Sequence, residues 1–297
     1  MIVGIVDGGA QLERCLAALA TQIQAPPLEV IIPWDDTVTG MQAFAVRYPD
    51  FRFLAMGQVP TLAPPTSHAG LHELYDKRRA AGLLAATGEL VGILEDRSVP
   101  EHDWARTAVR LHAERANGVI GGAIASGRDT LLGIADYLCD FYRYQPPLPA
   151  GPREFVSNVN ICYKRAVLER TRDLWKDAYY DLTVHWALQR EGEVLWLAPE
   201  LLVKQMRGDG TRLGALLSER LAWGRRFAVR RARETGAMGR LQYALQAPLV
   251  PLVLWSRVAR AQTGKPLAPF VAATPAMLLI FGAWGIGELM GYVTGRD

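Results

Sequence analysis

The stretch from Gly88 to Pro100 carries side chains whose types and spacing could do chemistry. An apolar strand ends there in Glu95, Asp96 and Arg97, and Pro100 stops the regular structure. In open α/β sheets, acids at the carboxyl end of a buried strand lie where ligands bind. This stretch therefore predicts a ligand site whose chemistry depends on what the two carboxylates hold.

Two more acids follow another predicted strand. Residues 28–33 are apolar, and Asp35 and Asp36 come shortly after them. Such acids can contact a bound ligand, but turns after strands are also rich in aspartate for conformational reasons. From the residues alone, both interpretations of Asp35 and Asp36 stay open.

Asp181 and two asparagines are further candidates. Asp181 opens a predicted helix that runs to Arg190, where it is either an N-cap or a carboxylate that accepts a proton. Asn158 and Asn160 lie in an irregular segment before another predicted helix. Each asparagine either binds a ligand or completes backbone hydrogen bonds.

Strands and helices alternate along the first two thirds of the chain, which predicts an α/β fold with a mostly parallel sheet. The predicted strands are residues 2–6, 28–33, 51–55, 88–95, 118–124 and 194–197, and the predicted helices include 11–22, 71–86, 104–117 and 181–190. Residues 136–144 are predicted helical, and the proline-rich segment after them is predicted to be a mobile flap over a cleft.

The composition narrows the class of protein. The chain has 297 residues, half of them hydrophobic, and a formal net charge of +3 that is too small to indicate nucleic-acid binding. Cys15, Cys139 and Cys162 lie far apart, which favours neither a disulfide framework nor a zinc site and fits a reducing environment. The first residues lack the features of a signal peptide, so we expect this part of the protein not to be secreted.

The composition changes near residue 212, which predicts one domain over residues 1–212 and a C-terminal region over 213–297. Residues 220–240 hold seven arginines and one acid, and residues 267–295 form a run in which Glu288 is the charged side chain. That run is long enough to cross a bilayer, and the basic residues before it would face anionic cytoplasmic lipid. Two alternatives to a membrane span stay open. The prolines in this region are compatible with re-entrant or interfacial helices, and the run could also be a buried helical hairpin of a soluble protein.

The order of these features resembles that of family 2 glycosyltransferases. The resemblance rests on Asp35-Asp36, on Arg79 and Gly82 in a basic helix, on ATGELVGILEDRSVP, on NICYKR and on Tyr180-Asp181 ahead of Gly192. The C-terminal GAWGIGELMGY looks like the membrane-associated tail of some members. The resemblance implies a GT-A fold and inverting transfer of a sugar from a nucleotide-sugar to an acceptor hydroxyl.

The resemblance also implies roles for individual residues. Asp181 is expected to be the general base that takes the proton of the acceptor hydroxyl. The residues expected to contact the donor are Asp35, Asp36, Arg79, Glu95, Asp96 and Arg97, whereas Lys77 and Arg78 are interpreted as solvated helix charges. Asn158 and Asn160 are expected on the acceptor side.

Two departures from the family pattern concern the metal. The family carries a D-x-D motif that binds a divalent cation, but here Glu95, Asp96 and Arg97 align with it, and an arginine cannot ligate a metal. Where many members have a histidine after a late strand, this chain has Gln205. A requirement for Mg²⁺ or Mn²⁺ therefore stays open, with Glu95 and Asp96 as the ligands of any such ion.

These departures suggest a substitute for the metal. We hypothesise that Arg97, helped by Lys204 or Arg207, supplies positive charge to the leaving diphosphate. The alternative is a catalytically degenerate relative that binds a nucleotide-sugar or a membrane partner without turnover.

The leading hypothesis is a glycosyltransferase of the cell inner membrane with its catalytic domain on the cytoplasmic face. Its expected partners are a nucleotide-sugar donor, a lipid-linked or glycan acceptor and the membrane, with no nucleic acid. The sequence leaves the sugar, the linkage and the oligomeric state undetermined.

Overall fold

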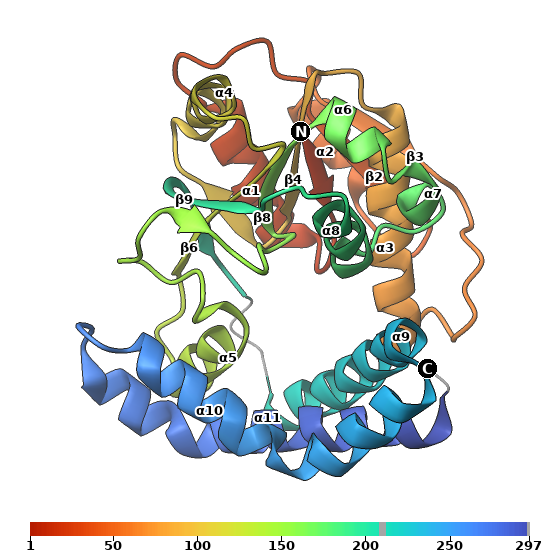
Figure 1. Cartoon of the computed structure of the whole chain (residues 1–297). Helices are drawn as coiled ribbons and strands as arrows, with labels where there is room; N and C mark the ends of the chain where they lie inside the picture. Colours follow the sequence, from red (N-terminus) through yellow and green to blue (C-terminus); the bar gives the residue numbers. More distant parts are fainter. Residues whose placement is uncertain (208–211, 296–297) are drawn as a thin grey trace. The chain divides into compact units, whose positions relative to one another are not determined.

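The computed structural model describes residues 1–207 and 212–295, which fall into two compact units (Figure 1). The first unit comprises Met1–Pro65, Gly70–Gly127 and Tyr144–Met206, and the second comprises Thr66–Ala69, Arg128–Arg143 and the residues from Arg207 onward. The division lies close to the predicted boundary at residue 212. It differs from the prediction because residues 128–143 pack with the C-terminal helices instead of the sheet.

The strands all belong to the first unit. They are β1 (Ile2–Gly4), β2 (Ile31–Trp34), β3 (Arg52–Ala55), β4 (Leu90–Glu95), β5 (Ser98–Pro100), β6 (Val119–Ser126), β7 (Gly151–Pro152), β8 (Asn160–Lys164) and β9 (Trp196–Gln205). The helices that accompany them are α1 (Gly9–Ala20), α2 (Met41–Arg47), α3 (His68–Ala85), α4 (Trp104–Glu114), α6 (Arg165–Glu169), α7 (Arg172–Trp175) and α8 (Asp181–Arg190). The second unit contains α5 (Leu131–Phe141), α9 (Leu213–Gln246), η1 (Ala247–Leu249), α10 (Val250–Ala261) and α11 (Leu267–Thr294).

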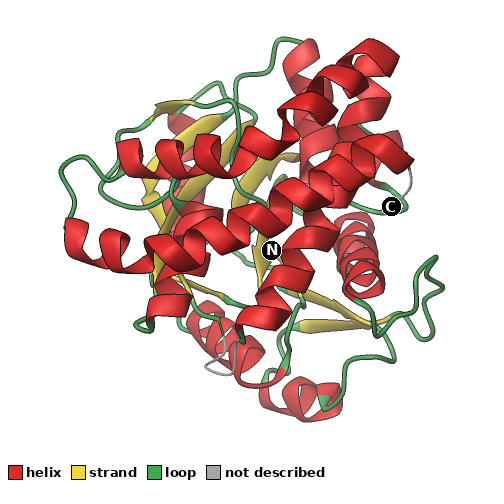
Figure 2. Cartoon of the chain, turned by 90° about the horizontal axis from the view of Figure 1, so that it is seen from below, coloured by secondary structure: helices red, strands yellow, loops and turns green. Residues whose placement is uncertain are grey.

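The strands form a mixed sheet in the order β3-β2-β1-β4-β8-β6-β9-β5, drawn in yellow in Figure 2. Strands β3, β2, β1 and β4 are parallel, which confirms the predicted α/β fold. Strand β8 runs antiparallel between β4 and β6, and β7 adds to β9, so the proline-rich segment is tied to the sheet at Gly151 and Pro152. Because β1 and β4 are neighbours, the residues that follow them meet at one edge of the sheet.

Asn160 joins three strands in the middle of this sheet. The pairing of β6 with β9 shifts register after Gly122, which leaves backbone carbonyls without ladder partners. The Asn160 Nδ2 atom donates to the carbonyls of Ala123 at 2.9 Å and Leu201 at 2.8 Å, and its Oδ1 accepts from Trp104 Nε1 at 2.8 Å. The side chain is fully buried. Asn160 therefore completes hydrogen bonds inside the sheet, and we no longer assign it to an acceptor site.

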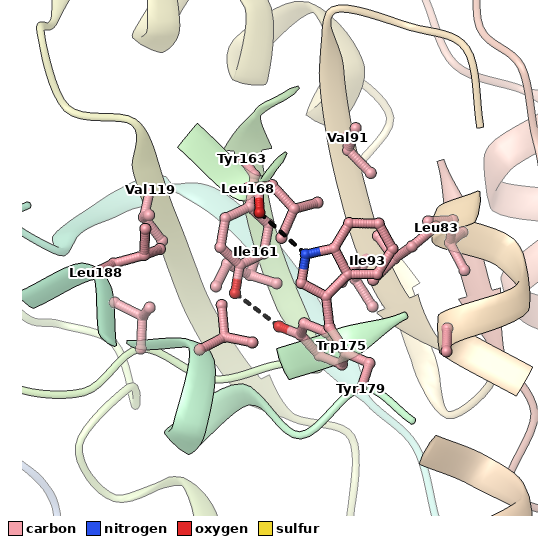
Figure 3. Close-up of a cluster of buried hydrophobic side chains, with 14 of the residues drawn as sticks. Leu83, Val91, Ile93, Val119, Ile161, Tyr163, Leu168, Trp175, Tyr179 and Leu188 are labelled. Atoms are coloured by element: carbon pink, nitrogen blue, oxygen red, sulfur yellow. Dashed lines mark hydrogen bonds between the residues drawn. The ribbon is translucent and has the colours of Figure 1, made fainter. Parts of the chain in front are cut away.

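A buried cluster of apolar and aromatic side chains packs β4 and β8 against α7 and α8 (Figure 3). Within it, Trp175 Nε1 donates to the Leu168 carbonyl at 3.0 Å, and the hydroxyls of Tyr163 and Tyr179 lie 2.6 Å apart. Tyr163 also contacts His185 Nε2 at 2.7 Å. Burial lowers the pKa of His185 to about 4, although the charge of Asp181 acts in the opposite direction. This histidine is therefore neutral in the folded protein at physiological pH.

In the second unit, α5 and α9 are joined by buried charges. Arg220 of α9 donates to Asp136 at 2.5 Å and to both carboxylate oxygens of Asp140. Arg128 and Arg207 also contact Asp136. The charges of these arginines, with the hydrogen bond from Arg220, outweigh burial and hold the pKa of Asp136 below its usual value. This cluster explains why residues 128–143 belong with the C-terminal helices.

We predict that Asn160→Ala lowers the free energy of unfolding by about 3 kcal/mol or more, because three buried backbone and indole groups lose their partners. Chemical denaturation measures the change. Asn158→Ala is the matched control, since Asn158 is only half-buried and lies in a turn. Equal stabilities of the two variants would contradict the role given to Asn160.

We predict that His185 makes the protein less stable in acid. The unfolded histidine binds a proton below about pH 6.5, whereas the folded one does so only near pH 4. Stability is therefore lost as pH falls from 6.5 towards 4, by up to about 3 kcal/mol. Denaturation at pH 7 and pH 4.5 should show a smaller loss for His185→Gln than for the unchanged protein. His102→Gln, at a 66% exposed side chain, serves as the control that keeps the full loss.

Candidate functional site

Asp96 joins the carboxyl ends of β1 and β4. Its Oδ2 atom accepts from the backbone N–H groups of Asp7 at 2.9 Å and Gly8 at 2.6 Å, while its own N–H donates to the Gly4 carbonyl. Gly8 and Gly9 have φ of 68° and 52°, a conformation that favours glycine. Asp96 thus fixes the turn that precedes α1, although it does not cap the first N–H groups of the helix itself.

The Asp96 carboxyl is fully buried, and its Oδ1 atom has no hydrogen-bond partner among the residues that the structure describes. Burial raises the pKa of this group to about 7, against the opposing effects of Arg97 and of the hydrogen bond from Gly8. Asp96 was predicted to contact the donor or a metal. In the structure it holds the turn between β1 and α1.

Arg97 forms a two-point ion pair with Asp7. Its Nε donates to Asp7 Oδ2 at 2.7 Å and its Nη2 to Oδ1 at 2.6 Å. The Arg97 side chain is 10% exposed and that of Asp7 is 35% exposed. Sequence reasoning missed Asp7, although it follows an apolar strand as Asp35 does. The pair is neutral overall, so the charge of Arg97 is already compensated within the chain.

Glu95 contacts Gln205 at the end of β9. Gln205 Nε2 donates to Glu95 Oε1, and the Tyr75 hydroxyl lies 3.5 Å from Oε2. Both Glu95 and Gln205 are buried. Across residues 1–207 and 212–295, the side chains of Asp, Glu, His and Cys form no group of three or more that could hold a metal ion. Arg97, which follows Glu95 and Asp96, is a cation and cannot ligate a metal, so these two acids are the carboxylates of this stretch that could.

Arg78 of α3 reaches the same edge of the sheet. Arg78 donates through Nε to Asp35 at 2.5 Å and through Nη1 to the Ile5 carbonyl at 2.9 Å. Although burial alone would raise the pKa of Asp35, hydrogen bonds from Arg78 and Thr37 hold it below its usual value. The interpretation of Arg78 as a solvated charge is wrong, because the side chain is 3% exposed and pairs with a buried acid. Lys77 is 25% exposed and pairs with Glu73.

Arg79 lies deeper in the first unit. Its Nη2 donates to Asp76 at 2.7 Å and to the Tyr179 carbonyl at 3.1 Å. The guanidinium carbon lies 3.9 Å from the ring centre of Tyr75 and 4.9 Å from that of Tyr179. Its side chain is fully buried. Arg79 therefore holds the segment that leads directly into Asp181.

Asp181 is the first residue of α8, with Tyr180 as the N-cap. The alternative of Asp181 as the N-cap is off by one residue, and the side chain of the actual N-cap, Tyr180, makes no capping hydrogen bond. The carboxylate is half-buried. It lies near enough to Arg79 to help raise the pKa of that arginine.

The other predicted residues lie apart from this arrangement. Asp36 is exposed, and its backbone N–H donates to Gly57. Asn158 is half-buried in a turn, and Lys204 is exposed on β9. Arg207 is engaged with Asp136 and Glu219 in the second unit. We therefore do not assign Arg207 a role beside Arg97.

No family model matches this sequence, and no curated protein matches it. Among solved structures, the mannosyltransferase PcManGT from Pyrobaculum calidifontis, in complex with GDP-Man and Mn²⁺, is similar over 97% of this chain and 86% of its own, with a TM-score of 0.56 and 16% identity. The structure of S. aureus TarS 1–349 has a TM-score of 0.48 at 13% identity, and the match covers 77% of this chain and 63% of that one. The structure of the same protein in complex with UDP-GlcNAc has a TM-score of 0.49 at 13% identity, and the match covers 74% of this chain and 64% of that one.

The two TarS comparisons fall below a TM-score of 0.5 and carry no argument. The likeness to the mannosyltransferase, at 16% identity, shows a shared fold. This chain therefore has an α/β fold that is also the fold of a glycosyltransferase.

Proposed function

We propose that this chain is an inverting glycosyltransferase that uses a nucleotide-sugar donor. The observation that carries the proposal is the half-buried Asp181 carboxylate at the start of α8. It stands in the same unit as the charged edge of the sheet formed by Asp7, Asp35, Glu95 and Arg97. The shared fold and the order of motifs support the same conclusion.

The proposed reaction is a single displacement. The oxygen of an acceptor hydroxyl attacks the anomeric carbon of the donor sugar, and the bond from that carbon to the diphosphate oxygen breaks. Asp181 takes the hydroxyl proton, and the nucleoside diphosphate leaves with the bonding electrons. Arg79 positions the segment before Asp181 through its contact with the Tyr179 carbonyl.

The leaving diphosphate needs positive charge, and we assign Arg97 to it. Asp7 now occupies two N–H groups of Arg97 in the way that a phosphate oxygen pair would. We propose that the donor diphosphate takes the place of Asp7 on the guanidinium. The proposed donor site comprises Asp35, Glu95 and Arg97, with Asp7 as a competing internal anion.

The acceptor is proposed to be lipid-linked or a glycan, and the enzyme to lie at the cytoplasmic face of the inner membrane. Helix α11 is long and apolar enough to cross a bilayer, by length and composition. The second candidate function is a catalytically degenerate relative that binds the donor without transfer. The Glu95–Gln205 contact and the Asp7–Arg97 pair support it, because Gln205 and Arg97 stand in the sequence where the resemblance to family 2 glycosyltransferases implies metal-binding side chains.

We predict that Asp181→Asn lowers the rate of sugar transfer by about 10²-fold or more, because the acceptor proton loses its base. A panel of nucleotide-sugars is tested for binding by calorimetry and for release of nucleoside diphosphate. Donor affinity should stay within about twofold, since the base contacts the acceptor. Asp177→Asn, at an exposed acid four residues earlier, is the matched control. Unchanged transfer by Asp181→Asn would remove Asp181 from the mechanism, and donor binding without transfer by the unchanged chain would select the degenerate alternative.

We predict that Asp7→Asn raises the affinity for a nucleoside diphosphate severalfold, because it frees Arg97 and removes a competing anion. Arg97→Gln should lower that affinity by about tenfold or more. Titration calorimetry with and without EDTA measures both effects. Weaker binding by Asp7→Asn, or activity that disappears with EDTA and returns with Mn²⁺, would contradict the role given to Arg97.

A further inference from the structure

Helix α11 exposes one continuous apolar stripe in the second unit. Val271, Leu279, Ile286 and Val293 recur at seven or eight residues, which places them on one face of the helix. Their exposed fractions range from 53% to 65%. At 28 residues the helix is about 42 Å long. So long an uncharged stripe is unusual on a surface that faces only water.

The opposite face of α11 is held against α9 by close backbone contacts. A Cβ atom added to Gly287 would lie 2.2 Å from the Leu221 carbonyl oxygen, and one added to Gly224 would lie 2.3 Å from that of Trp284. At Gly291, an added Cβ atom would meet the Arg225 carbonyl oxygen at 2.5 Å. Only glycine permits so close an approach of two helices. The C-terminal half of α11 is therefore committed to α9 on this side.

The second half of α9 covers another side of α11. Helix α9 has a non-helical residue at Gly236, where φ is 69° and ψ is −172°. Beyond it, Tyr243 stacks on Tyr292 at 5.7 Å, and Arg240 Nη2 donates to the Val293 carbonyl at 2.6 Å. The two halves of α9 thus flank the C-terminal part of α11. Helix α5 also packs against α11.

If α11 crossed a bilayer and kept its contacts, the helices packed against it would also have to enter the bilayer. Residues 220–240 of α9 carry seven arginines, and several lie at the level of the α11 contacts, such as Arg225 beside Gly291. Charged side chains in the hydrocarbon core are strongly disfavoured. Crossing therefore requires either buried arginines in lipid or loss of the α9–α11 contacts.

Helix α10 adds a second exposed face that changes from apolar to basic. Leu252 and Val253 are exposed in its first half, and Arg257 and Arg260 are exposed on the same side in its second half. Residues 213–295 hold ten basic side chains and three acids. Two of these acids, Glu219 and Glu288, are buried. Of the acids in the described residues 213–295, Glu234 alone is exposed.

From this combination we infer that α9, α10 and α11 lie in the plane of an anionic membrane surface and do not cross it. The apolar stripe of α11 and the first half of α10 enter the acyl boundary, and Arg257 and Arg260 contact phosphate groups of the lipid head groups. The inference deepens the membrane association proposed above, on which it rests. It is independent of whether the first unit transfers sugar.

The first test is flotation of the full chain with vesicles of phosphatidylcholine alone or with phosphatidylglycerol added. Binding should be stronger to the anionic vesicles and should weaken as salt rises. Val271→Glu combined with Ile286→Glu should reduce binding at least tenfold. Val46→Glu combined with Val109→Glu, at exposed helix positions of the first unit, should not. Arg257→Gln and Arg260→Gln should each weaken binding to anionic vesicles about fivefold.

The second test asks on which side of the membrane the ends of α11 lie. Single cysteines are placed at Ala268 and Thr294, both exposed, in a Cys139→Ala background in which Cys15 and Cys162 are buried. The chain is synthesised in the presence of anionic vesicles and treated with an impermeant maleimide. Both thiols should react before detergent is added. Reaction of one thiol only after detergent would overturn the in-plane arrangement while keeping membrane association.

Other outcomes separate this inference from the proposed reaction. Absence of binding to every vesicle, or a detergent-free dimer in which the α11 stripe is protected, would overturn it. Sugar transfer to a water-soluble acceptor would still be measured in each case. The failure of one proposal is therefore distinguishable from the failure of the other.

Discussion

The first unit depends on the hydrogen bonds that Asp96 makes across the ends of β1 and β4. One carboxylate oxygen accepts two backbone N–H groups, which fixes the turn from Asp7 to Gly9 that leads into α1. The same turn places the Asp7 carboxylate on Arg97. A buried carboxyl with an unpaired oxygen is costly, and the raised pKa of Asp96 reflects that cost. The buried Asp96 carboxyl therefore fixes the turn at this edge of the sheet but lowers the stability of the folded protein.

Charge pairing is the second constraint on this edge. Arg97 is paired with Asp7, Arg78 with Asp35, and Arg79 with Asp76. Asp35 and Asp76 are buried, so each would be a costly isolated charge without its arginine, whereas Asp7 is partly exposed. If the donor binds as proposed, its diphosphate takes the place of an acid on one of these arginines, and the partly exposed Asp7 is the group best placed to move.

The second unit shows how helix packing changes the meaning of an apolar segment. Length and composition alone make α11 a candidate for a membrane span. The glycine contacts with α9 and the Arg240 hydrogen bonds to its last carbonyls bind it to a basic helix instead. Arginines are tolerated at a lipid head-group surface but not in hydrocarbon. The packing of α11 on α9 therefore favours a helix that lies in the plane of the membrane surface over one that crosses the bilayer.

The sequence by itself determined the α/β fold, the position of Asp181 near the start of a helix and the charged end of β4. These features depend on hydrophobic periodicity and on the residues that begin and end helices and strands, which are local properties of the chain. It also indicated the change of composition near residue 212. Only the tertiary structure decided which arginine pairs with which acid. Arg78 and Arg79 are adjacent in sequence, but the packing of α3 on the sheet brings Arg78 to Asp35 and Arg79 to Asp76. The role of Asn160 was equally hidden, because it depends on a register shift between β6 and β9, two strands far apart in the chain.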